Sequence, residues 1–106
     1  MRETVEILGV RAVVARTFTE RARGLIARPR PAKGEGMLIL KCNAIHTFFM
    51  SYPIDAAFLD RNDEVVKIVK AIPPWRFFIW GGWRAVKVLE TPSGDTSHIG
   101  EQDRRI

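Results

Sequence analysis

The fold is decided by the stretch His46–Asp60, which reads HTFFMSYPIDAAFLD. Its first part is strongly apolar and is interrupted at residues 51–53, where Ser, Tyr and Pro follow one another. The chain then resumes as a predicted strand over Ile54–Asp60. A turn at residues 61–63 leads into a second predicted strand, Glu64–Ile72, in which Val and Ile dominate. The stretch therefore predicts a β-hairpin near the middle of the chain.

Further strands are expected on both sides of this hairpin. Thr4–Leu8 and Val10–Arg16 are rich in β-branched residues and are separated by a glycine. Met37–Lys41 and Ala85–Glu90 are short apolar runs of the kind found in buried strands. These runs predict a domain that consists mainly of strands.

One helix is expected in the first third, over about residues 18–28 and ending before Pro29. Thr17 and Glu20 have the spacing of a capping box. Apolar residues follow at helical intervals, namely Phe18, Ala22, Leu25 and Ile26. Gly24 lies inside this pattern, where glycine lowers helix stability, so it indicates close approach by a neighbouring group or a ligand.

The segment Trp75–Arg84 reads WRFFIWGGWR and contains five of the ten aromatic residues of the chain. Aromatic side chains are more often buried than displayed, so we expect them to fold over an open end of the domain as core. Two other interpretations remain open. The segment could contact a protein partner, a second copy or a membrane interface, or it could stack on bases or sugars.

Length, composition and charge set broad limits. A chain of 106 residues predicts a single domain, residues 1–106, and no apolar run reaches the roughly 20 residues of a membrane-spanning helix. The acidic residues near the N-terminus do not fit an export signal, which predicts a cytoplasmic location. The net charge is +5, and residues 1–36 hold eight Lys or Arg against four Glu. This basic excess favours an acidic partner such as RNA or a small anion.

Several short motifs occur in a fixed order along the chain: Glu20-Arg21 with Gly24-Leu25, Gly36-Met37, His46-Thr47-Phe48-Phe49-Met50, Pro53-Ile54-Asp55, Phe58-Leu59-Asp60, Pro74-Trp75-Arg76, and Leu89-Glu90 with Pro92 and Gly94. Together, over roughly residues 13–103, they resemble the uncharacterised bacterial and archaeal family called domain-of-unknown-function family 192. The resemblance implies a mainly β (α+β) domain, a compact antiparallel β-sandwich or barrel-like fold with one helix near the N-terminus. It implies no reaction.

The residues that could line a site come from these motifs. His46 and Asp55 could form an orienting or proton-transfer pair, although a buried pair that satisfies backbone groups at a bend is the preferred interpretation. The candidate ligand-binding residues are Arg21, Gly24, Met37, His46, Met50, Asp55, Trp75 and Arg76.

Three classes of function follow from these residues. The first is a non-catalytic module that binds a small, anionic ligand or a protein. The second is an interaction domain that uses the basic first third on RNA or an acidic protein. The third is a small hydrolase that uses His46 and Asp55, with Cys42, Thr47 or Ser51 as nucleophile, but none of these lies in a catalytic signature.

No cofactor and no metal site are predicted. The two histidines, His46 and His98, and the single Cys42 show no metal-ligand spacing.

Overall fold

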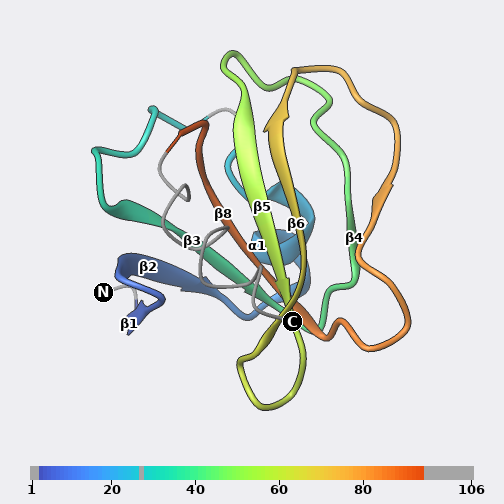
Figure 1. Ribbon diagram of the computed structural model, residues 1–106. Coiled ribbons are helices and arrows are strands. Elements are labelled where there is room, and N and C mark those ends of the chain that lie inside the picture. The colour runs from blue at the N-terminus through green and yellow to red at the C-terminus, as the bar shows by residue number, and fades with distance from the viewer. Residues whose placement is uncertain (1–2, 27, 95–106) are drawn as a thin grey trace.

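The computed structural model describes residues 3–26 and 28–94 of the 106-residue chain. Within them the chain forms a six-stranded sheet, a two-stranded sheet and one short helix, α1, which spans Phe18–Arg23 (Figure 1). The strands of the large sheet are, in spatial order, β1 (Thr4–Ile7), β2 (Val10–Ala15), β3 (Glu35–Leu40), β8 (Lys87–Pro92), β5 (Ile54–Leu59) and β6 (Val65–Ile72). The small sheet pairs β4 (Ala44–Ile45) with β7 (Ile79–Trp80). The predicted mainly β architecture with one helix in the first third is confirmed.

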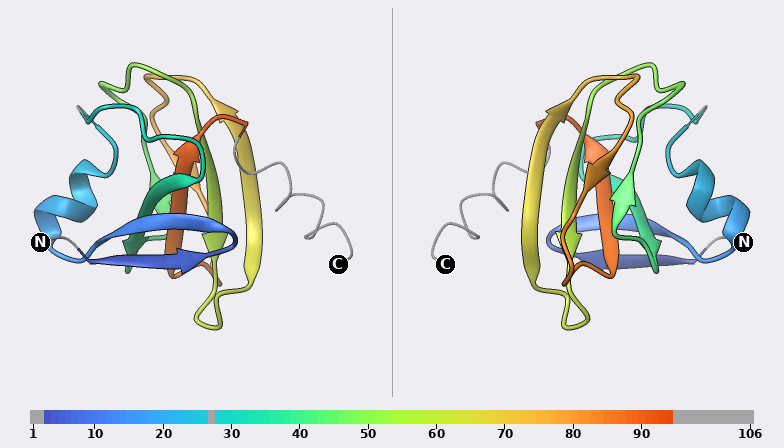
Figure 2. Two further views of the ribbon diagram at one scale, coloured as in Figure 1. Left: turned by 90° about the vertical axis from the view of Figure 1, so that its left-hand side faces the viewer. Right: turned by 90° about the vertical axis from the view of Figure 1, so that its right-hand side faces the viewer.

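The large sheet is mixed, although its expected antiparallel pairing holds for most neighbours. The exception is the pair of β2 and β3, which run parallel with Ala12 opposite Gly36. The connection between them, residues 16–34, contains α1, and a parallel pair needs a connection of about that length. Figure 2 shows α1 at one side of the molecule and β6 at the other.

Strand β8 lies at the centre of the sheet, between β3 and β5. Within it Glu90 pairs with Met37 on one side and with Ala56 on the other. This position puts a carboxyl group in the middle of the sheet, and Glu90 is only 4% exposed.

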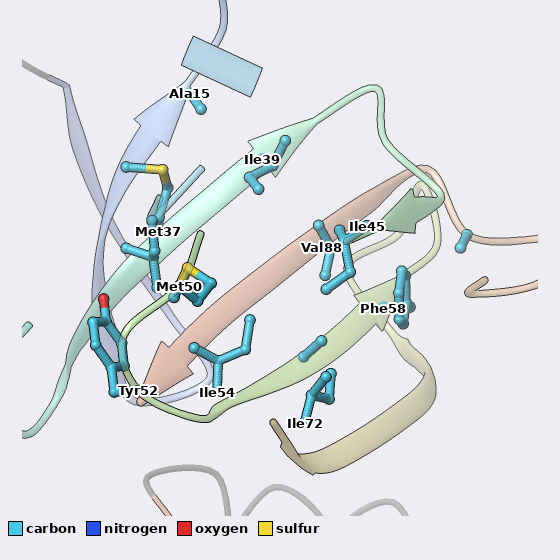
Figure 3. Packing of buried hydrophobic residues seen from close by; sticks show 13 residues of the cluster. Ala15, Met37, Ile39, Ile45, Met50, Tyr52, Ile54, Phe58, Ile72 and Val88 are labelled. Atoms are coloured by element: carbon cyan, nitrogen blue, oxygen red, sulfur yellow. The ribbon is translucent and has the colours of Figure 1, made fainter. Parts of the chain in front are cut away.

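Two apolar clusters cover the two faces of the central strands. Successive side chains of a strand point to opposite faces, so Val88 belongs to the larger cluster and Leu89 to the smaller one. The larger cluster, shown in Figure 3, also includes Ile45 and Met50 from the segment that follows β3. Burial on both faces explains why β5 is apolar along almost its whole length.

Helix α1 is shorter than the sequence predicts. The predicted capping box between Thr17 and Glu20 is present, but the helix ends at Arg23 instead of continuing to residue 28. Gly24 ends it by adopting a φ of +52° while its N–H donates to the carbonyl of Glu20. In so short a helix the expected apolar stripe does not form, and Phe18 is 76% exposed.

The aromatic segment is the main error of the sequence-based prediction. It does not fold into the core, because Trp75, Phe77, Phe78 and Trp83 are 59%, 78%, 63% and 88% exposed. The backbone around Trp75 is instead fixed to the segment 46–50 by Thr47, a buried residue. The aromatic side chains therefore point outward from an anchored backbone.

Thr47 makes four hydrogen bonds across this junction. Its N–H donates to the carbonyl of Arg76 (3.0 Å), and its carbonyl accepts from the N–H of Trp75 (2.8 Å). Its hydroxyl donates to the carbonyl of Pro73 (2.7 Å) and accepts from the N–H of Arg76 (2.8 Å). Pairing of this kind replaces the regular strand that the apolar run after Ile45 suggests.

Candidate functional site

A small cavity of about 240 Å³ lies beside the end of α1, between the helix and the segment 42–50. Its polar lining consists of Arg21, Arg23, Cys42, His46 and Glu90. Its apolar walls include Leu25, Ile26, Ile39, Ile45 and Met50. Apolar walls with a few convergent polar groups are typical of small-molecule sites, and this volume is at the small end of their range.

Glu90 is the buried acid of this cavity. Burial raises the pKa of Glu90 from the ordinary value of 4.5 to about 7, and the backbone of Leu25 opposes this rise only in part. The end of α1 lies directly on the carboxyl group, since a Cβ added at Gly24 would be 3.0 Å from Oε1 of Glu90. The close approach that the sequence indicates at Gly24 is therefore made by the Glu90 side chain.

Arg21 supplies a cation from α1. Its Nη1 donates to the carbonyl of Lys41 at 3.3 Å, while its Nε is buried and has no hydrogen-bond partner. Within residues 3–26 and 28–94 no ion pair joins this guanidinium to Glu90. An unpaired N–H donor that is kept from water is costly, so this donor would gain from a ligand acceptor.

Cys42 and His46 lie along the same cavity, because the chain turns between them and β4 begins there. The thiol of Cys42 donates to the carbonyl of Ala44 at 3.1 Å, and burial raises its pKa above the ordinary value. A neutral thiol is a weak nucleophile, so the geometry does not favour catalysis by Cys42. His46 is exposed, and its Nδ1 accepts from the N–H of Phe48 at 3.2 Å.

Asp55 lies elsewhere, in β5, with its side chain buried. Its Oδ1 accepts from the N–H of Ala71 (2.8 Å) and its Oδ2 from the N–H of Gly94 (3.0 Å). The first of these bonds holds Ala71 in the left-handed region, with a φ of +54°. Asp55 thus satisfies backbone groups at bends, as the preferred interpretation has it, but His46 is exposed, so the two residues are not the buried pair of that interpretation, and Asp55 does not line the cavity.

We expect Asp55→Asn to lower the free energy of unfolding by about 2 kcal/mol, because one carboxylate acceptor would become an amide donor facing an N–H. Urea unfolding followed by circular dichroism measures this change. Asp63→Asn is the control for the loss of one carboxylate at an exposed turn position, where it removes only an ion pair with Lys87, and it should change stability by less than about 1 kcal/mol. Equal stability of Asp55→Asn and the wild type would contradict a structural role for Asp55.

The structure brings together four of the eight residues selected from the sequence, and these four are Arg21, Gly24, His46 and Met50. Met37 is buried in the larger apolar cluster and does not line this cavity. Trp75 and Arg76 lie on the surface, next to the segment 46–50.

The sequence reasoning missed Glu90 as part of the site and considered Cys42 only as a candidate nucleophile. A signal for Glu90 was present, because a carboxyl group inside a predicted buried strand is unusual and needs a partner. The place of Cys42 in the cavity depends on the turn that follows β3.

The described residues contain no group of three His, Cys, Asp or Glu side chains that could hold a metal ion. His98 lies outside these residues. No helix in the described part of the chain is long and apolar enough to cross a membrane.

The fold and the cavity define a class of mainly β domain with a small pocket built around a buried glutamate. The chain belongs to domain-of-unknown-function family 192, described as "Uncharacterized ACR", whose sequence pattern matches residues 2–105. It is 36% identical to a UPF0127 protein of Thermococcus sibiricus in an alignment 96 residues long that covers 87% of this chain and 61% of that protein. It is 40% identical to a UPF0127 protein of Pyrococcus horikoshii in an alignment 87 residues long that covers 76% of this chain and 71% of that protein.

Two solved structures have the same fold. A protein of unknown function from Novosphingobium aromaticivorans superposes with a TM-score of 0.73 at 25% identity, covering 92% of this chain and 76% of the other. A Sinorhizobium meliloti protein, named as a candidate transcription regulator, superposes with a TM-score of 0.77 at 21% identity. The superposition covers 86% of this chain and 74% of the other. The second likeness concerns the fold alone. The family and its relatives carry no assigned activity.

Proposed function

We propose that this protein is a non-catalytic binding module whose cavity takes a small organic carboxylate with a short apolar body. The observation that carries the proposal is the buried, unpartnered Nε of Arg21 in a cavity that also contains Glu90. A guanidinium edge is well suited to a carboxylate, because its N–H groups match the two oxygens.

Glu90 adds a pH dependence to this binding. Below its pKa of about 7 the Glu90 carboxyl group is neutral and can donate a hydrogen bond to an anion. Above that pH it is ionised and repels a second carboxylate. A carboxylate ligand should therefore bind better as the pH falls through 7.

The walls of the cavity limit what else the ligand can be. Leu25, Ile39 and Met50 are each at most 6% exposed, and they surround the polar groups with apolar surface. An apolar body of a few carbons would be desolvated there, whereas a large, fully polar anion would leave groups unpaired. The volume of about 240 Å³ also favours a small molecule.

The basic first third offers less support for RNA binding. Arg11 contacts Glu6 at 3.4 Å and Arg16 contacts Glu3 at 2.6 Å. The Nε of Arg28 donates to the carbonyl of Gly24 at 2.7 Å and that of Arg23 to the carbonyl of Ile26 at 2.9 Å. Much of the predicted basic surface is thus engaged within the chain, and we do not extend the proposal to RNA. The cytoplasmic location stays a prediction from the N-terminal sequence.

The test is a titration with butyrate, followed by 1H–15N NMR of the amides of residues 24–26. We expect saturable shifts that require about tenfold more butyrate at about pH 8 than at about pH 6, because neutral Glu90 becomes about tenfold rarer. Arg21→Gln should abolish the shifts.

The matched control is Lys33→Gln, which removes an exposed cation from the loop before β3 and should bind butyrate as the wild type does. Undiminished binding by Arg21→Gln, or shifts that grow linearly without saturation, would overturn the proposal.

A further inference from the structure

A group of aromatic residues, most of them exposed, is carried by residues 48–49 and 75–83. This aromatic surface consists of Phe48, Phe49, Trp75, Phe77, Phe78, Trp80 and Trp83. Phe49, Phe77 and Trp83 are 67%, 78% and 88% exposed. The two segments that carry it run side by side through the pairing of β4 with β7 (Figure 1). Exposed apolar groups of this extent mark interaction sites.

The backbone is strained at two of the residues that carry the aromatic side chains. Phe49 and Trp75 have φ values of +66° and +70°, which bulky side chains rarely adopt. The four hydrogen bonds of Thr47 hold this conformation, and the rings of Phe49 and Trp75 meet at a centroid distance of 4.8 Å. Strain that displays apolar residues to solvent indicates a function for the display.

The two stretches of chain that carry the aromatic surface contain basic residues and no acidic ones, although Asp60, just after β5, lies beside Trp83. Neither residues 41–54 nor residues 65–89 contain an Asp or a Glu, whereas the second segment contains five Lys or Arg. The Nζ of Lys67 donates to the carbonyl of Trp80 at 2.7 Å, and Arg76 lies exposed between Trp75 and Phe77. Arg84 contacts Asp60 at 3.4 Å, so Lys67 and Arg76 are the cations available to an anionic partner at this surface.

We propose that the aromatic surface docks on the interface of a lipid bilayer that carries anionic headgroups. Trp and Phe side chains partition into the boundary between headgroups and acyl chains, and neighbouring Lys and Arg attract anionic lipids. The aromatic side chains and the basic ones both come from residues 41–54 and 65–89. These two segments contain no Asp or Glu that would be repelled by anionic headgroups.

A second copy of the chain fits less well. A symmetric dimer through this surface would bring its cations face to face without any acidic residue of these segments to pair with them. A nucleic acid also fits less well, because stacking needs free ring faces. Here Trp80 and Trp83 meet edge to face at 86°, and Phe49 and Trp75 at 60°, so in each pair one ring face is already occupied.

The experiment is co-sedimentation of the full chain with vesicles of phosphatidylcholine alone and of phosphatidylcholine and phosphatidylglycerol in equal parts. We expect binding to the anionic vesicles, with a blue shift of tryptophan fluorescence, and at least about tenfold weaker binding to the neutral ones. The double variant Phe77→Ser, Trp83→Ser should lower the partition coefficient at least about tenfold, because both side chains are exposed without the membrane and buried with it.

Phe18→Ser is the matched control, since Phe18 is 76% exposed but lies on α1, outside the aromatic surface. It should bind vesicles as the wild type does. Sedimentation velocity without lipid and titration with a poly-uridine oligonucleotide complete the test. Absence of vesicle binding would overturn the proposal, and so would an equal loss of vesicle binding in Phe18→Ser. Dimerisation or RNA binding that the double variant abolishes, while its vesicle binding persists, would also overturn it.

Discussion

Replacing Glu90 by Gln should make the free energy of unfolding almost independent of pH between about 4.5 and 7, where the wild type loses about 3 kcal/mol. Burial raises the pKa of Glu90 from 4.5 to about 7 in the folded chain. Between these values the folded chain holds a proton that the unfolded chain has released, so the wild type becomes less stable as the pH rises. The difference between the two pKa values corresponds to about 3 kcal/mol in the free energy of unfolding.

Urea unfolding at several pH values between 4 and 8 checks this prediction. Above about pH 7 the Glu90→Gln variant should be more stable than the wild type by that same amount, since it buries an amide instead of a charge. Glu64→Gln, at an exposed position, serves as the control for the loss of one carboxyl group. Parallel stability curves for Glu90→Gln and the wild type would show that the carboxyl group ionises in the folded chain as it does in water.

Thr47→Val is expected to lower the free energy of unfolding by about 3 kcal/mol, although the two side chains have nearly the same shape. Valine cannot replace the hydroxyl that donates to the Pro73 carbonyl and accepts from the Arg76 N–H. Thr47 is 1% exposed, so both backbone groups would face a buried methyl group in place of the hydroxyl, at about 1 to 3 kcal/mol each. Thermal or urea unfolding measures the effect.

Thr47→Ser separates the hydrogen bonds from packing, because it keeps the hydroxyl and removes only a methyl group. We expect it to cost about 1 kcal/mol. If Thr47→Val were no less stable than Thr47→Ser, the hydroxyl would not be what fixes the two aromatic segments to each other.

Local chemistry in the sequence was enough for most of the secondary structure. The β-branched run 65–72 forms a strand as predicted, even though its apolar residues also fit helical spacing. The capping box at Thr17 and Glu20 starts the helix where predicted, since its hydrogen bonds join residues three apart. The end of the helix was not predictable in the same way, because Gly24 is placed by contact with Glu90, which is distant in sequence.

The residues of the cavity likewise divide into those that the sequence predicted and those that only the tertiary structure placed there. Arg21, Gly24, His46 and Met50 could be selected from their motifs, but the sequence suggested Asp55 as the partner of His46. Asp55 binds the backbone at Ala71 and Gly94 instead, and Glu90 is the acid of the cavity. Pairing between β3, β8 and β5 decides this, because it sets which residues of β8 face the helix.

The sequence by itself determined the family, the mainly β composition, the first turn of the helix and the hairpin from Ile54 to Ile72. All of these depend on side-chain preferences and hydrogen bonds between near neighbours. Only the tertiary structure decided that Glu90 is buried beside Arg21 and that the aromatic segment is displayed. Burial depends on what the rest of the chain leaves uncovered, and here Thr47 anchors the backbone of that segment while its aromatic rings remain in solvent.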